Sequence, residues 1–211
     1  MPVNEPLYPI NLRLAGVPCL VVGGGRVALG KVVGLLEAGA WVRVVALDVI
    51  DELAAVEGVT VVRRAYEPDD LDGCRLAIAA TDDPSVNHAV FVHGEARGVL
   101  VNAADDPDNC RFTLPARIRQ GSLLVTFATG GHSPALAKWL RRRYAAEFGP
   151  EYDVLISMLA DARADLVARG LSTEGRGWQQ ALDSGMLELI REGHLAEAKE
   201  RLQACLSSSS G

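Results

Sequence analysis

Three consecutive glycines near the start of the chain could hold a phosphate group. They follow the apolar run 17–22, and a helix-like pattern follows them, which indicates a strand, a tight turn and a helix. Gly23-x-Gly25-x-x-Ala28 fits the dinucleotide-binding fingerprint. The first glycine permits the turn, the second lets the backbone approach a pyrophosphate, and the small third residue lets the helix pack on the strand. The first amide groups of the helix would then point at that pyrophosphate.

An acidic residue stands where such a site needs one for a ribose. The apolar run 41–47 is typical of a second strand and ends in Asp48, at the spacing at which a carboxylate would hold a ribose hydroxyl. Ligands of parallel sheets bind outside the carboxyl ends of the strands. That rule gathers four loops at one crevice: Gly23–Val27, Leu47-Asp48, Thr81-Asp82-Asp83 and Asn102–Asp106.

A carboxylate in the last of these loops could act as a base. Asp105 or Asp106, placed at a strand end beside a nicotinamide, could accept a proton while a hydride leaves toward the cofactor. The alternative is that Asp105-Asp106-Pro107 is only a turn, for which Asp and Pro are common residues. The segment 81–84 is open to the same two interpretations, because Ser, Thr or Asp before a proline can cap the next helix.

A second glycine-rich loop, Thr129–Pro134, leads into another predicted helix. Its backbone amides and hydroxyls suit an anion such as a substrate carboxylate. The simpler interpretation is the exit of a hairpin, in which Ser133 caps a helix that has Pro134 at its first position. The two roles are compatible.

The sequence predicts no preformed metal site. His88 and His93 are five residues apart on a predicted helix, so they do not share a face. A transient metal contact by Asp105 or His132 stays open. The run Arg141–Arg143 is interpreted as a solvated helix face rather than a binding patch.

Strands and helices alternate in the first half of the chain. We expect strands at 17–22, 41–47, 59–64, 76–80 and 99–104, helices after the glycines and at 49–56 and 85–97, and a short connection at 68–71. This alternation predicts a parallel sheet. The pattern then changes to strand-like runs at 112–118 and 123–128, a helix from 134 to about 148, and helical chain from 151 with breaks near 170–177 and at 193. The predicted fold is therefore α/β, with an N-terminal Rossmann-like sheet, a small α+β segment and a C-terminal helical domain.

Composition restricts the classes of function. The 211 residues carry a net charge of −6 and no long basic run, which argues against general nucleic-acid or membrane-surface binding. The four cysteines are scattered without a paired spacing, and Cys19 and Cys74 lie in apolar runs typical of a core. No apolar run is long enough to span a bilayer, and the N-terminus lacks a signal pattern. We expect a cytoplasmic protein.

These motifs together resemble the precorrin-2 dehydrogenase / sirohydrochlorin ferrochelatase family, the dehydrogenase module of sirohaem synthases. The resemblance covers residues 7 to about 143. The matching stretches are Leu20–Lys31, Leu36–Ala40, Leu76–Asp83, Val86-Asn87, Asn102 with Asp105 and Pro107, Phe112 with Pro115, and Gly130–Ala137.

The resemblance implies NAD⁺-dependent oxidation of precorrin-2 to sirohydrochlorin, with Asp105 as the catalytic carboxylate. In some members the same cavity inserts Fe²⁺, which is a co-substrate rather than a bound cofactor. By this resemblance the NAD-binding residues are Gly23, Gly25, Arg26, Val27, Leu47, Asp48, Thr81 and Asp82. The residues bordering the tetrapyrrole are Asn102, Arg111, Arg117, Thr129, Gly130, His132 and Ser133. Asp48 without a neighbouring arginine favours NAD over NADP, because a 2′-phosphate would be repelled.

The resemblance also implies a homodimer formed by exchange of a segment after the Rossmann unit. The expected organisation is an NAD-binding Rossmann domain at 1–113, a dimerisation segment at 114–148, a helical domain at 149–206 and a disordered tail at 207–211. Two alternatives stay open. One is a dehydrogenase without chelatase activity, and the other is a Rossmann regulator that senses NAD without turnover.

Overall fold

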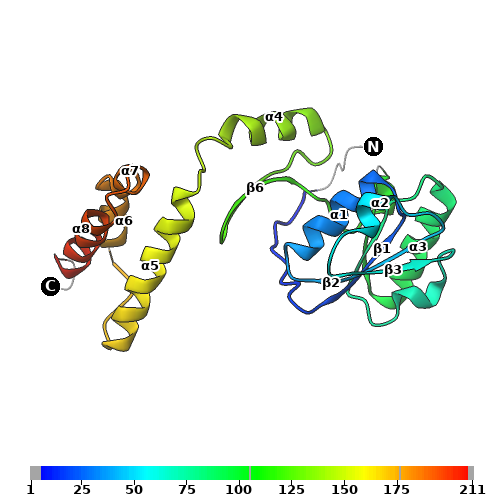
Figure 1. Ribbon diagram of the computed structural model, residues 1–211, viewed down its shortest axis with the longest axis horizontal. Coiled ribbons are helices and arrows are strands. Elements are labelled where there is room, and N and C mark those ends of the chain that lie inside the picture. The colour runs from blue at the N-terminus through cyan, green and yellow to red at the C-terminus, as the bar shows by residue number, and fades with distance from the viewer. Residues whose placement is uncertain (1–5, 105, 176, 209–211) are drawn as a thin grey trace. The chain divides into compact units, whose positions relative to one another are not determined.

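The chain folds into two compact units in a computed structural model that describes residues 6–104, 106–175 and 177–208 (Figure 1). The first unit comprises the chain up to Leu114 together with Gly130–Ser133, and the second comprises Pro115–Thr129 and the chain from Pro134 onward. Each unit has its own secondary structure and its own core.

The first unit is built on a parallel five-stranded sheet, which confirms the predicted fold. The strands are β1 (Pro18–Val22), β2 (Trp41–Ala46), β3 (Val59–Arg63), β4 (Leu76–Ala79) and β5 (Leu100–Ala103), in the order β3-β2-β1-β4-β5. The strand order reverses between β1 and β4, and ligands of such sheets bind at the carboxyl ends of the strands beside this point. The sheet therefore brings the glycine turn to the position that a dinucleotide requires.

Helices cover both faces of this sheet. On one face α1 (Arg26–Leu36) and α2 (Asp51–Ala54) bury Ala28, Val32 and Leu53 against the strands. On the other face the short 3-10 helix η1 (Pro68–Leu71) and α3 (Pro84–Arg97) bury Leu71 and Val90. The central strands are apolar along their length because both of their faces are buried.

Three elements differ from the sequence prediction by several residues. The helix expected from 134 to about 148 ends at Tyr144. The helix expected at 49–56 is only the single turn of α2. The strand expected from Phe112 begins only at Ala116, because the preceding residues extend the first unit. The Arg111 amide donates to the Val101 carbonyl at 2.8 Å, and Pro115 has no amide hydrogen with which to pair a neighbouring strand.

The second unit begins with the antiparallel hairpin of β6 (Ala116–Gln120) and β7 (Leu123–Phe127). Gly121 turns the hairpin at a φ of 52°, a conformation that favours glycine. Helix α4 (Pro134–Tyr144) packs on both strands, and Tyr144 stacks on Phe127 with ring centroids 5.9 Å apart.

The remainder of the second unit is helical. It consists of α5 (Glu151–Ala168), α6 (Gly177–Asp183), α7 (Met186–Arg191) and α8 (Leu195–Ser208), which share a core around Leu155, Met186 and Leu202. The break between α6 and α7 at Gly185, where φ is 84°, was not predicted. Ser207 belongs to α8 rather than to a disordered tail, and residues 209–211 lie outside the described part of the chain. Within the described residues, no helix combines the length and the apolarity needed to cross a membrane.

Candidate functional site

Two of the three glycines are required by the packing of neighbouring loops. Gly23 has a φ of 121°, and a Cβ there would lie 2.2 Å from the carbonyl oxygen of Ala80, just after β4. A Cβ on Gly24 would lie 2.0 Å from the carbonyl oxygen of Asp48, just after β2. Both obstacles are backbone atoms, so any side chain would separate the loops that converge at the switch point. The fingerprint Gly23-x-Gly25-x-x-Ala28 leaves position 24 unspecified, so this packing role of Gly24 was not predicted.

Gly25 differs because the space beside it is open. No atom lies within 4 Å of a Cβ built there, and its φ of −90° is accessible to any residue. Gly25 precedes α1 and supplies no side-chain acceptor to the first-turn amides, while Ala28 is fully buried behind them. Open space in front of the first amides of a helix is what a pyrophosphate requires, so these residues fit a dinucleotide.

The residues predicted for the adenosine end lie at the same edge. The Ile50 amide donates to the Gly24 carbonyl at 3.0 Å, which fastens the loop after β2 to the glycine turn. Asp48 is exposed in this loop, and the Leu47 side chain is 71% exposed. Val27 on α1 is also exposed, at 49%. Apolar side chains at this edge offer a surface for an adenine or a ribose.

Arg26 lies at the start of α1 and is directed toward α2. It forms an ion pair with Glu52 at 3.6 Å, and both side chains are largely exposed. Its predicted contact with the pyrophosphate stays a prediction.

The loop after β4 is held from α3 by one buried side chain. Asn87, which is 6% exposed, accepts from the Thr81 amide at 3.2 Å and from the Thr81 hydroxyl at 2.8 Å. Its amide nitrogen donates to the Thr81 carbonyl at 3.0 Å. Thr81 is therefore directed toward α3, while Asp82 is exposed beside it. Their cofactor contacts stay predictions.

Asp83 is the residue of this loop that caps α3, as one of the two sequence interpretations expected. Its Oδ1 accepts from the Ser85 amide at 2.8 Å and from the Ser85 hydroxyl at 2.6 Å. These hydrogen bonds to the charged carboxylate lower the pKa of Asp83.

The loop after β5 contains the proposed base, Asp105, which lies outside the described residues. The structure does describe its neighbours. The Ala104 amide donates to the Ala79 carbonyl at 2.8 Å, and Asp106 Oδ2 accepts from Asn109 Nδ2 at 2.6 Å. The second of the two adjacent carboxylates is therefore engaged within its own loop.

Asn102 is used to hold the chain that follows this loop. Its Nδ2 donates to the Phe112 carbonyl at 2.8 Å and to Cys110 Sγ at 3.2 Å, and the side chain is buried. Its amide nitrogen is thus committed to structure, and its contact with a substrate stays a prediction.

The two arginines predicted to meet substrate carboxylates lie in different units. Arg111 pairs with Glu95 of α3 through two hydrogen bonds, and its guanidinium lies 5.9 Å from the centroid of the Phe91 ring. The hydrogen bonds from Arg111 lower the pKa of Glu95. Arg117 lies on β6 in the second unit. The role of both arginines in substrate binding stays a prediction.

The second glycine-rich loop is divided between the units. Thr129 belongs to the second unit, whereas Gly130, His132 and Ser133 belong to the first. Gly130 and Gly131 have φ values of 58° and 78°, which explains why two glycines stand here. The substrate contacts and the helix cap predicted for this loop stay predictions.

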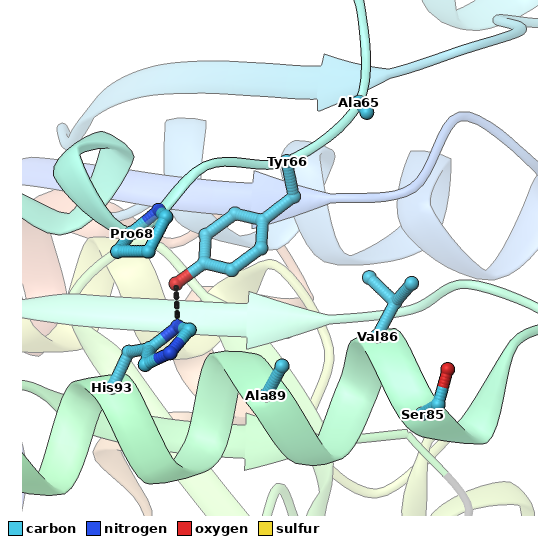
Figure 2. A pocket seen from close by; sticks show the side chains of 7 residues that line it. All are labelled: Ala65, Tyr66, Pro68, Ser85, Val86, Ala89 and His93. Carbon is cyan, nitrogen blue, oxygen red and sulfur yellow. Dashed lines mark hydrogen bonds between the residues drawn. The ribbon is translucent and has the colours of Figure 1, made fainter.

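A cavity of about 280 Å³ lies on the α3 face of the first unit. Figure 2 shows the Tyr66 hydroxyl directed toward His93, and these groups are 3.2 Å apart at Nδ1. Burial raises the pKa of Tyr66 to about 12. The lining residues are Ala65, Tyr66 and Pro68 from the segment after β3, and Ser85, Val86, Ala89 and His93 from α3. No local pattern links these two segments, so the cavity was not predicted from the sequence.

The last side chains to consider are the cysteines and the residue types that can hold a metal ion. Cys19 and Cys74 are buried core residues, as predicted. Burial, and to a lesser extent the nearby Cys74, raises the pKa of Cys19 to about 11. No group of three or more His, Cys, Asp or Glu side chains that could hold a metal ion occurs within 6–104, 106–175 and 177–208.

Comparison with known proteins places these features in a family. Residues 10–116, half of the chain, match the family described as "Putative NAD(P)-binding". The chain is 38% identical over 206 residues to a siroheme synthase of Pseudomonas entomophila, covering 95% of this chain and 44% of that protein. It is 39% identical over 201 residues to a siroheme synthase of Methylococcus capsulatus, covering 92% and 42%. The chain thus spans less than half the length of these relatives.

A solved structure is similar over nearly the whole chain. It is that of "SirC, precorrin-2 dehydrogenase", with a TM-score of 0.73 and 28% sequence identity, covering 95% of this chain and 100% of the other. The glycine turn, the order of the strands and the family match agree. The chain belongs to the NAD(P)-binding family that residues 10–116 match.

Proposed function

We propose that this protein oxidises precorrin-2 to sirohydrochlorin with NAD⁺. The observation that carries the proposal is the similarity of nearly the whole chain to a solved precorrin-2 dehydrogenase, and the open space beside Gly25 at the start of α1 agrees with it. The similarity to two siroheme synthases over at least 92% of this chain supports the same pathway step.

The first unit supplies the cofactor site of this proposal. The amides at the start of α1 bind the pyrophosphate beside Gly25, and the Asp48 carboxylate accepts from the hydroxyls of the adenosine ribose. A 2′-phosphate would place negative charge against Asp48, so the cofactor is NAD rather than NADP. The bound nicotinamide supplies the hydride acceptor.

In this proposal a carboxylate accepts the proton that the macrocycle loses. Oxidation removes a hydride and a proton from the reduced macrocycle, and the hydride alone goes to the cofactor. In this proposal Asp105 accepts the proton. The choice of Asp105 follows the family resemblance of the sequence, in which Asp105 stands three residues after Asn102 and two before Pro107.

Chelation of Fe²⁺ into sirohydrochlorin is a second proposed activity. Insertion of the metal requires the loss of two pyrrole N–H protons, and the same carboxylate would accept them. The name of the siroheme synthase relatives supports the step, since sirohaem is an iron tetrapyrrole. An anaerobic assay with sirohydrochlorin and Fe²⁺ or Co²⁺, compared with the uncatalysed rate, decides whether the activity is present.

We further propose a cytoplasmic homodimer. Helix α4 supports this assembly because it carries two exposed apolar side chains, Trp139 at 53% and Leu136 at 47%. A sedimentation measurement that gives a stable monomer at micromolar concentration would contradict it.

One experiment tests the dehydrogenase. Purified protein is mixed with NAD⁺ and enzymatically generated precorrin-2, and the absorbance of NADH and of sirohydrochlorin is followed. Equal formation of the two products is expected. Binding of NAD⁺ without any turnover would instead favour a redox-sensing regulator.

A further inference from the structure

Two adjacent residues of α3 hold two different loops at the carboxyl edge of the sheet. Asn87 binds the amide, the hydroxyl and the carbonyl of Thr81, in the loop after β4. His88 is exposed, and its Nδ1 lies 2.8 Å from Oδ1 of Asn109, in the loop after β5. The helix therefore reaches both loops from consecutive positions.

The direction of the second set of hydrogen bonds follows from chemistry. A carboxylate only accepts, so the group that Asn109 presents to Asp106 at 2.6 Å is its Nδ2. Asn109 Oδ1 therefore faces His88 as an acceptor, and His88 must donate from Nδ1. The result is a chain of two hydrogen bonds, in which His88 donates to Asn109 and Asn109 donates to Asp106.

This chain of hydrogen bonds ends at the carboxylate of Asp106, the residue that follows position 105. Asp106 follows residue 105 directly, and its carbonyl accepts from the Asn109 amide and from Cys110 Sγ, both at 3.2 Å. On the other side the Ala104 amide is bonded to Ala79 of β4. The described residues on either side of position 105 are thus each anchored.

We propose that His88 and Asn109 are positioning residues for the dehydrogenation. They fix the loop of the proposed base to the helix that, through Asn87, also fixes the loop after β4. The separation of the two loops is then set by one rigid element. This inference rests on the proposed function, and it adds two residues that act only through the loop after β5, which they hold. Displacement of a reacting group by about 1 Å can cost about a hundredfold in rate.

Substitutions at the two residues test the chain of hydrogen bonds in the full-length protein. His88→Leu and Asn109→Leu remove the link, and Asn109→Asp places a second carboxylate against Asp106. His88→Asn should restore function, because the amide nitrogen of asparagine can donate from nearly the position of imidazole Nδ1. Asp108→Asn, a substitution at an exposed residue of the same loop, is the matched control.

We expect kcat to fall about tenfold to a hundredfold in both leucine variants and further in Asn109→Asp. The Kd for NAD⁺ should stay within about twofold, because Asn87 still holds its loop. Amide hydrogen exchange should show faster exchange at 103–110 in the leucine variants, and His88→Asn should restore both exchange protection and kcat. The Asp108→Asn control should match the wild type.

Three outcomes would overturn the inference. They are unchanged exchange in the leucine variants, faster exchange with an unchanged kcat, or equal losses of kcat in His88→Asn and His88→Leu. A wild-type protein that makes no NADH from precorrin-2 would refute the proposed function and the catalytic role together. Hydrogen exchange would then still show whether His88 and Asn109 hold the loop, because that measurement needs no turnover.

Discussion

The backbone of Gly24 lies directly against the carbonyl of Asp48, so that a Cβ on the glycine would be 2.0 Å from that oxygen. The loop that would hold the phosphates and the loop that would hold the ribose are therefore packed directly against each other. The Ile50 amide strengthens the contact by donating to the Gly24 carbonyl at 3.0 Å. Substitutions on the two sides of this contact should therefore have separable effects on folding and on cofactor binding.

Gly25→Ala should fold normally but bind NAD⁺ at least about tenfold more weakly, equivalent to about 1.4 kcal/mol. The added methyl group meets no protein atom within 4 Å, so it should not disturb folding, and in the proposed site it would lie in the space beside the pyrophosphate. Thermal unfolding and titration with NAD⁺ measure the two effects. Gly23→Ala is the matched comparison, because its methyl group would lie 2.2 Å from a backbone oxygen and should impair folding itself. Unaltered NAD⁺ affinity in Gly25→Ala would exclude the pyrophosphate from the space beside Gly25.

Asp48→Ala should weaken NAD⁺ binding about tenfold to a hundredfold, because a hydrogen bond to a charged group contributes about 1.5–3 kcal/mol. The ratio of the affinity for NADP⁺ to the affinity for NAD⁺ should rise, since the carboxylate that repels the 2′-phosphate is gone. Stability should hardly change, because the side chain is exposed. Parallel titrations with both cofactors check the prediction, and a constant ratio of the two affinities would argue against a ribose contact.

Asp105→Ala should slow formation of NADH by about a hundredfold to ten-thousandfold, the usual contribution of a general base. The Kd for NAD⁺ should stay close to that of the wild type. Stopped-flow absorbance with precorrin-2 gives the rate, and equilibrium titration gives the affinity. Turnover that survives at the wild-type rate would show that another group or water takes the proton.

The stability of the first unit should fall in acid because of Asp70. This carboxylate is 3% exposed and accepts from Arg64 at 2.7 and 2.8 Å and from the Glu67 amide at 2.9 Å. Burial alone would raise the pKa of Asp70, but the hydrogen bonds from Arg64 and Glu67 outweigh burial and lower it. Its stabilisation is therefore fully present above the pKa of an unfolded Asp, about 3.9, and is lost as the pH falls through the lower folded value.

Asp70→Asn should accordingly lower the free energy of unfolding at neutral pH by about 2 kcal/mol, in the range for hydrogen bonds to charged groups. It should also flatten the acid limb of the curve of stability against pH. Asp69→Asn is the control, because the Asp69 side chain is 86% exposed and its ion pair with Arg97 should contribute less than about 1 kcal/mol. Urea unfolding at several pH values measures both, and an acid limb as steep in Asp70→Asn as in the wild type would contradict the assignment.

Much of the first unit could be predicted because the signals are local. The apolar run of β4, the glycines at 23–25 and the alternation of strands with helices each depend on residues close in sequence. The strand was predicted to begin at Phe112, although β6 begins at Ala116. A strand-like run does not show which partner it will contact in the folded protein. That partner is Asn102, whose side chain binds the Phe112 carbonyl.

The parallel sheet, the glycine turn and the acidic residue after β2 could all be predicted from local patterns, since the spacing of apolar residues and glycines dictates backbone shape over short distances. The folded structure was needed to show which polar groups are already bound to partners. It paired Arg64 with Asp70 on the β3–β4 crossover, Tyr66 with His93 across a cavity, and His88 with Asn109 between two loops. Arg64 and Asp70 are only 6 residues apart, whereas the other two pairs join segments 27 and 21 residues apart that the fold brings together. Hydrogen-bond geometry between side chains has no counterpart in the spacing of residues along the chain.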